Sequence, residues 1–96
     1  MSECVVRTVR RQDGSQVAHL EEEIKACMDA GNTEIVLDME ETVYISSVTL
    51  RVILKAQKAL LQKGGRLLIR HAGAPVMEVF DLVGFTGLLT FEDDAS

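Results

Sequence analysis

Short apolar segments alternate with amphipathic ones along most of this chain, and this alternation constrains its fold more than any other feature. The apolar runs near residues 5–10, 34–39 and 66–70 have the length of strands and are bounded by turn or polar residues. Between them, apolar side chains recur at helical spacing over about 16–30 and 47–61. Strands that alternate with helices are typical of a mainly parallel sheet with right-handed crossovers and helical cover. We therefore predict an α/β fold.

The predicted order of elements is β-α-β-α-β-α, with a possible final strand at 88–91 and with one antiparallel strand possible. Gly31 and Gly64 follow the first two helices, as glycines at the C′ position do. Pro75 opens the third helix, where its missing N–H costs nothing.

The pattern contains no repeat, linker or low-complexity segment, so we predict a single domain over 1–96. Its core is expected to span about 5–91, followed by an acidic tail, 92–96, that we expect to be frayed.

The second predicted helix has two distinct faces. Arg51, Lys55 and Lys58 lie along one of them, and this stripe is either a solvated face or a contact for an acidic partner. The other face is predicted to be buried, with Gln57 as its single polar interruption. Its apolar members are Leu50, Ile53, Leu54, Leu60 and Leu61.

Composition excludes several classes of protein. No apolar run approaches the roughly 20 residues of a membrane span, and the N-terminal residues lack the apolar core of a signal peptide, so no membrane partner is expected. A net charge of −5 argues against nucleic acid as the main partner. Cys4 and Cys27 have no metal-ligand or redox spacing, so we expect two reduced thiols in a cytoplasmic protein.

The sequence offers little for an enzyme. It lacks the glycine-rich nucleotide loops, the nucleophile elbow and the histidine–cysteine patterns of metal sites, so we predict no catalytic residue, cofactor or metal. Ser47 and His71 could share the rim at the carboxyl ends of the strands and act as nucleophile and base. They lack a third residue to orient them, and His71 is otherwise expected to be an exposed loop residue.

Ser46 and Ser47 stand where the second helix begins. A serine there is first of all an N-cap, because its oxygen accepts a backbone N–H that has no partner within the helix. The same place tolerates an added phosphate well, because free N–H groups and the helix dipole favour negative charge. Phosphorylation would replace a hydroxyl with a bulky dianion on a surface where a partner could pack.

The order of these motifs resembles that of STAS domains, and of bacterial anti-sigma-factor antagonists in particular. The resemblance begins with the apolar strand Ile35–Met39, which ends in aspartate, and continues with Val43–Leu54, which opens a helix. The segments Lys63–Ile69 and Ala74–Phe85 are similar to the family's next strand and third helix. The similarity covers about residues 5–91 and implies a STAS-like fold.

The resemblance also implies a function. Ser47 matches the serine that an ATP-dependent anti-sigma factor kinase, with a histidine-kinase-type ATPase fold, phosphorylates. The unmodified antagonist would bind that kinase, phosphorylation would release it, and a serine phosphatase would restore binding. The residues implied in partner binding are Ser46, Ser47, Val48, Thr49, Arg51 and Lys55.

Three departures from the family pattern keep alternatives open. Ser46 stands where aspartate is usual, and Thr49 where glycine is usual. Little sequence is left for the extra strand that normally precedes the first one here. One alternative is an unswitched STAS scaffold in a stress-signalling or transport-accessory complex, and another is a small-molecule or nucleotide-binding module.

Overall fold

The computed structural model describes residues 3–92, and within them four parallel strands form the main sheet in the order β1-β3-β5-β6. The strands are β1 (Glu3–Arg7), β3 (Glu34–Asp38), β5 (Arg66–Arg70) and β6 (Thr90–Glu92). Three helices accompany them: α1 (Val17–Asp29), α2 (Ser47–Gln62) and α3 (Ala74–Leu82). The predicted α/β fold is therefore confirmed.

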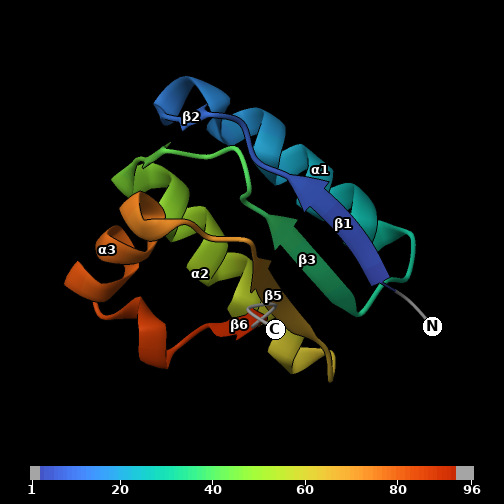
Figure 1. Ribbon diagram of the computed structural model, residues 1–96. Coiled ribbons are helices and arrows are strands. Elements are labelled where there is room, and N and C mark those ends of the chain that lie inside the picture. Colours follow the sequence, from blue (N-terminus) through green and yellow to red (C-terminus); the bar gives the residue numbers. More distant parts are fainter. Residues whose placement is uncertain (1–2, 93–96) are drawn as a thin grey trace.

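Helices α1 and α2 run behind the sheet in Figure 1, whereas α3, the start of α2 and β2 (Arg11–Gln12) lie toward the carboxyl ends of the strands. A second, two-stranded sheet pairs β2 with β4 (Tyr44–Ile45), also in parallel. The predicted run 5–10 thus ends earlier as a strand, and the chain continues into this small sheet. Among the described residues no strand pair is antiparallel, since β6 also joins the sheet in parallel.

The core lies between the sheet and α1 and α2. It includes Ile35, Leu37 and Leu67 from the strands and Ile53 and Leu60 from α2, all fully buried. Burying each such side chain contributes roughly 1.5–3 kcal/mol, so this layer supplies most of the driving force for folding.

Gln57 breaks the apolar face of α2 without leaving a buried polar group unpaired. Its amide nitrogen donates to the Leu88 carbonyl at 2.9 Å, and its side-chain oxygen accepts the Leu67 N–H at 3.2 Å. The residue therefore ties α2 to both β5 and the segment before β6. Leu61 was predicted on the same face, but it is 57% exposed, because its direction on α2 lies just beyond the contact with the sheet.

The sheet face opposite α1 and α2 carries an apolar row flanked by charges. Val5, Val36 and Leu68 are aligned in register across three strands. The Arg70 guanidinium hydrogen-bonds with Glu92 and lies 3.8 Å from Glu3, so its side chain lies across this face. Within this row Val36 and Leu68 are buried, whereas Val5 on the edge strand is 44% exposed.

The C-terminal boundary differs from the prediction by one residue. Glu92 was assigned to the acidic tail, but it is the last residue of β6, where it pairs with Arg70 in the sheet register, and its carboxylate accepts hydrogen bonds from the Arg70 side chain. These hydrogen bonds also hold the pKa of Glu92 below its ordinary value. The expected fraying of the tail concerns residues 93–96, which lie outside the described part of the chain.

Two adjacent glycines connect α2 to β5. Gly64 has a φ of +77°, in the left-handed region that favours glycine. Gly65 has an ordinary φ, but a Cβ built there would lie 1.9 Å from the Thr33 carbonyl oxygen. That close approach lets the neighbouring Arg66 N–H donate to the same oxygen at 2.9 Å.

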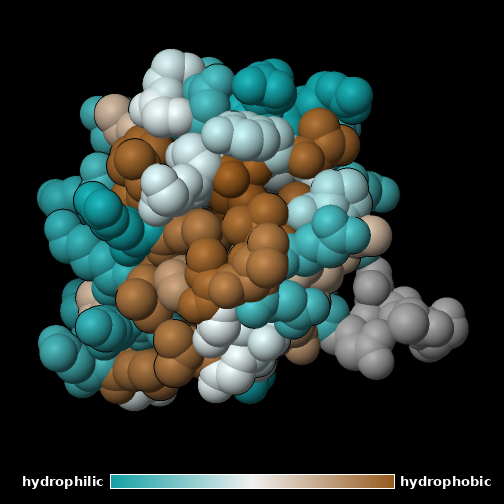
Figure 2. Space-filling view, turned by 90° about the vertical axis from the view of Figure 1, so that its left-hand side faces the viewer, coloured by the Kyte–Doolittle hydropathy of each residue, from teal (hydrophilic) through white to brown (hydrophobic). Residues whose placement is uncertain are grey.

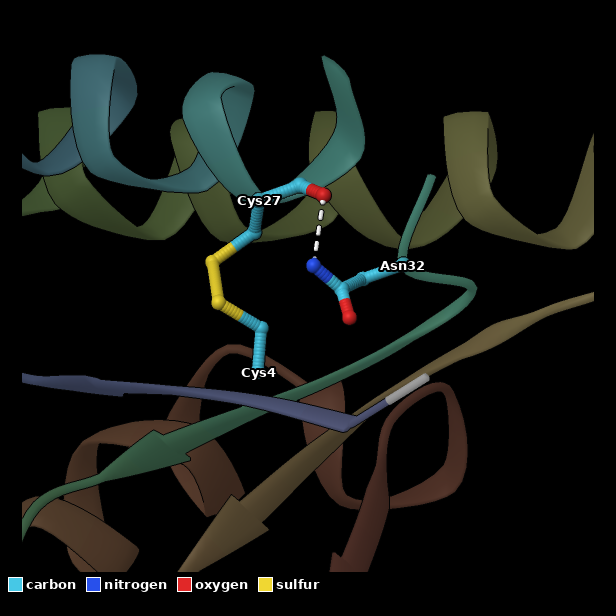
Figure 3. The surroundings of a disulfide bond; sticks show 3 residues. All are labelled: Cys4, Cys27 and Asn32. Atoms are coloured by element: carbon cyan, nitrogen blue, oxygen red, sulfur yellow. Dashed lines mark hydrogen bonds between the residues drawn. A yellow bond between two sulfur atoms is a disulfide. The ribbon is translucent and has the colours of Figure 1, made fainter. Parts of the chain in front are cut away.

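The two cysteines correct a prediction. Cys4 and Cys27 were expected to be reduced thiols, but a disulfide joins them, with their Cα atoms 6.0 Å apart (Figure 3). Cys4 lies on β1, and Cys27 belongs to the buried stripe of α1 with Leu20 and Ile24, which faces the sheet. A sequence separation of 23 residues gave no sign of this proximity.

Candidate functional site

The start of α2 is held by a cap that Ser46 provides. The Ser46 Oγ accepts the Thr49 N–H at 3.2 Å, and its carbonyl accepts the Leu50 N–H at 3.1 Å. Ser47 is therefore the first helical residue and not the cap, and it is exposed. Capping and the predicted acceptor role fall on two neighbouring serines, which leaves the Ser47 side chain on the surface.

Thr49 connects this cap to β2. Its side chain is fully buried, and its hydroxyl donates to the Gln12 carbonyl at 3.1 Å. The same carbonyl accepts the Ser46 N–H at 3.0 Å. A glycine at position 49 could not make the first of these bonds, so the departure from the family pattern has a structural consequence. The buried Thr49 thus links the start of α2 to β2.

The other predicted contact residues lie on the exposed side of α2. Val48 is 43% exposed, and Arg51 is exposed one turn after Ser47. Lys55 follows after two turns, about 12 Å from Ser47 along the helix axis at 1.5 Å per residue. It lines a groove of about 600 Å³ between α1 and α2. Of the predicted residues, Ser47, Arg51 and Lys55 thus follow one exposed side of α2, whereas Thr49 is buried, so the six do not form a single surface cluster.

An apolar surface adjoins the start of α2, and the sequence did not predict it. Figure 2 shows hydrophobic side chains gathered on the face where α3, β2 and the start of α2 meet in Figure 1. Leu82, the last residue of α3, is 86% exposed, so most of its apolar side chain faces solvent. Exposed apolar side chains that gather in one patch often mark an interaction surface. The other exposed apolar residues in or next to these elements and β4 are Val43, which precedes β4, Tyr44 in β4, Val48 in α2 and Val83, which follows α3.

This surface was missed because Val76, Val79, Phe80 and Val83 recur at helical spacing in the sequence, which predicts that all four lie on one buried face of the third helix. Val83 follows the last residue of the helix and is 46% exposed, whereas Val76 and Phe80 are buried as expected. A signal was present in the sequence: Leu82 lies off the apolar stripe of its helix. We call the exposed residues Val43, Tyr44, Val48, Leu82 and Val83 the apolar rim.

His71 is bonded to Asp38 and not to Ser47, the nucleophile that the sequence suggested for it. Its Nδ1 lies 3.1 Å from Asp38 Oδ1, and its φ of +60° is uncommon for a residue other than glycine. Burial raises the pKa of Asp38, but hydrogen bonds from His71 and from the Glu40 N–H outweigh this effect and leave the pKa below its ordinary value. His71 is thus part of a paired group at the ends of β3 and β5.

Asp38, Glu40 and His71 bring possible metal ligands within 4.8 Å of one another. Two of these groups are already bonded, since the Asp38 carboxylate accepts from the Glu40 N–H as well as from His71. We therefore interpret Asp38, Glu40 and His71 as a structural link between the ends of β3 and β5. No helix within residues 3–92 combines the length and apolarity needed to cross a bilayer.

Known proteins resemble this chain in both sequence and fold. The model of the family "Mlab, STAS domain" matches residues 2–90. The "Putative anti-sigma factor antagonist BtrV" of Bordetella bronchiseptica is 37% identical over 76 residues, which are 79% of this chain and 66% of BtrV. The chain thus spans about two thirds of the length of that relative.

Among solved structures, the protein TM1081 of Thermotoga maritima has a TM-score of 0.84 at 16% identity, over 96% of this chain and 74% of its own. The unphosphorylated anti-sigma factor antagonist SpoIIAA has a TM-score of 0.81 at 18% identity, over 99% and 84%. SpoIIAA from Bacillus is also known in its phosphorylated form, with a TM-score of 0.74 at 17% identity, over 98% and 86%. These similarities show a common fold.

Proposed function

The chain belongs to the STAS domain family, and from this premise we propose that it is an anti-sigma factor antagonist switched by phosphorylation of Ser47. As a member of this family it is a binding module and not an enzyme. The proposed partner is an anti-sigma factor serine kinase in the cytoplasm, and a serine phosphatase reverses the modification. The relative BtrV carries the name "Putative anti-sigma factor antagonist", and structures of SpoIIAA are known with and without phosphate.

The observation that carries this proposal is the exposed hydroxyl of Ser47 beside the apolar rim. Because Ser46 provides the cap, a phosphate on Ser47 would not remove the hydrogen bond that begins α2. A partner that packs on Val48 and Leu82 would meet the added charge at the edge of an apolar contact. Desolvating a dianion there is costly, so phosphorylation would weaken binding.

Arg51 has a proposed role in the phosphorylated state. It is exposed four residues after Ser47, so the two side chains lie on the same side of α2. A guanidinium at this spacing can pair with a phosphate and hold it against the helix. Lys55 lies too far along the helix to contact the same phosphate and is proposed to meet an acidic part of the partner.

Phosphate mapping tests the acceptor. The chain is incubated with ATP and with each serine kinase of the histidine-kinase ATPase type encoded in its own genome, and phosphate is located by mass spectrometry. We expect modification at Ser47, its loss in Ser47→Ala and its retention in Ser46→Ala. Equal modification of the Ser47→Ala variant would refute the assignment.

A binding titration tests the switch. Ser47→Asp should weaken binding to the modifying kinase by about tenfold or more, because the partner would have to desolvate a charge beside the apolar rim. A tenfold change in affinity corresponds to about 1.4 kcal/mol. Ser47→Asn has a similar size without the charge and serves as the matched control. Unchanged affinity of Ser47→Asp would favour the unswitched scaffold, in which the apolar rim binds its partner regardless of the state of Ser47.

A further inference from the structure

The disulfide between Cys4 and Cys27 closes a loop around β2. Cys4 lies in β1, before β2, and Cys27 lies near the end of α1, after it. The Cys27 carbonyl accepts hydrogen bonds from the backbone N–H of Asn32 at 3.2 Å and from its side chain at 3.0 Å (Figure 3). The helix end of the loop is therefore fixed to the turn that leads into β3.

The closed loop contains the residue that holds the start of α2. Gln12 lies in β2, and its carbonyl accepts both the Ser46 N–H and the Thr49 hydroxyl. Its own side-chain oxygen accepts the Val9 N–H at 3.0 Å, so Gln12 is also bonded within the loop. Gln12 thus connects residues 4–27 to the cap beside Ser47, and the Arg10 carbonyl adds a second link by accepting the Val43 and Tyr44 N–H groups at 2.9 and 3.2 Å.

The two cysteine residues differ in exposure. Cys4 is partly exposed on an edge strand, whereas Cys27 is 6% exposed. A thiolate from solution therefore reaches the Cys4 sulfur more readily. Disulfides in reducing compartments are commonly transient and redox-sensing, and the proposed function places this chain in such a compartment, the cytoplasm.

We propose that Cys4–Cys27 is a reversible thiol–disulfide exchange site, and that reducing it loosens the contact between β2 and the start of α2. The redox partner is a dithiol, either a small molecule or a protein. The regulatory meaning of this site rests on the proposed function, because it concerns the cap beside Ser47. The oxidised form keeps that cap fixed, and the reduced form opens it more often.

The exchange balances in two steps. A thiolate of the dithiol attacks the Cys4 sulfur, the bond between Cys4 and Cys27 breaks, and Cys27 leaves as a thiolate that takes up a proton. In the mixed disulfide, Cys4 is bonded to the first sulfur of the dithiol. The second thiolate of the dithiol attacks that first sulfur and releases Cys4, which is also protonated. Two electrons pass to the protein, and the dithiol becomes a disulfide. Oxidation by a disulfide of the same class is the reverse.

Hydrogen exchange measured by mass spectrometry tests the proposal on the intact chain. Dithiothreitol should reduce the disulfide under native conditions, as alkylation of both cysteines would report, while circular dichroism shows that the helices remain. In the reduced chain we expect exchange of the Ser46 and Leu50 amides to rise by about tenfold or more, because the loop loses a covalent constraint. Amides of β5 should keep their exchange rates.

Cys4→Ser provides the matched control, since it cannot form the disulfide and alters a partly exposed position. Its exchange at Ser46 should equal that of the reduced chain, with or without dithiothreitol. Exchange at Ser46 that stays within about twofold on reduction, or a disulfide that resists excess dithiothreitol in the folded chain, would overturn the proposal. Should the variant fail to fold, the comparison of oxidised and reduced wild type still decides. No phosphate is involved, so absence of phosphate on Ser47 would refute the proposed function separately.

Discussion

In the main sheet, β3 pairs over five residues with β1 on one side and with β5 on the other, whereas β2 and β4 pair over two residues each. The main sheet is held by its ladder and by the apolar layer beneath it. The small sheet is held largely by polar contacts. Gln12 accepts from Ser46 and Thr49, the Thr42 hydroxyl donates to the Val9 carbonyl at 2.8 Å, and Thr8 and Thr42 share a hydrogen bond.

The difference indicates how one domain can combine a stable fold with a surface that responds to a modification. Apolar burial is insensitive to small changes in position, but hydrogen bonds depend on geometry and are lost one at a time. We therefore expect the region beside Ser47 to have a lower local stability than the sheet and to open without global unfolding. Four substitutions or conditions test this contrast.

The largest effect is expected in the main core. Ile53→Ala removes a fully buried side chain beneath the sheet and should lower the free energy of unfolding by about 2–5 kcal/mol, measured by urea denaturation. Leu61→Ala, at a position 57% exposed on the same helix, should change it by less than about 0.5 kcal/mol. Similar costs for the two variants would mean that α2 is not packed as described.

The cap of α2 gives a smaller effect. Ser46→Ala should cost about 1 kcal/mol in the same measurement, because the Thr49 N–H loses its partner. Ser47→Ala removes an exposed hydroxyl one residue later and should cost well under half of that. A larger loss for Ser47→Ala than for Ser46→Ala would contradict the division of roles between the two serines.

The link between α2 and β2 is tested by Thr49→Val, which keeps the size of the side chain and removes its donor. We expect a loss of about 1 kcal/mol and faster exchange of the Ser46 amide, with little change in β3. Thr49→Ser retains the hydroxyl and should keep exchange at Ser46 slow, although it loses a buried methyl. Equal exchange in the two variants would show that the hydroxyl does not support the cap.

Acid should give the smallest effect. The pKa of Asp38 is lowered in the folded state, so its carboxylate adds stability above the ordinary value of 3.8, and this stability is lost as pH falls through the folded-state pKa. Thermal unfolding between about pH 5 and 2 should therefore show a shallower acid dependence in Asp38→Asn than in wild type. The remaining slope comes from other carboxylates with lowered pKa, such as Asp13 and Glu92. An unchanged slope would show that the bond to His71 is not maintained.

Periodicity predicted the helices and the strands β1, β3 and β5 because their apolar side chains follow a regular pattern. The same reasoning missed contacts that depend on distant partners. Gln57 appeared as a flaw in an apolar face, since its two partners lie 10 and 31 residues away. The pairing of Cys4 with Cys27 required the register of β1 and the position of α1 together.

The site was predicted in part for the same reason. Ser47 was identified from its place at a helix start and from the family pattern. Local sequence could not show which of the two serines is the N-cap, because this depends on the extended backbone angles of Ser46. The apolar rim joins α3 to β4 and α2, and only the folded chain brings these together.

The glycine pair between α2 and β5 bears on how this chain can vary. In a saturation library both positions would appear intolerant, but their profiles would differ. Position 64 should accept asparagine best among the substitutes, because this residue enters the left-handed region at modest cost. Position 65 should reject even alanine, because any Cβ meets the Thr33 carbonyl. The substitution profile of two neighbouring residues would thus separate a constraint of backbone angle from one of space.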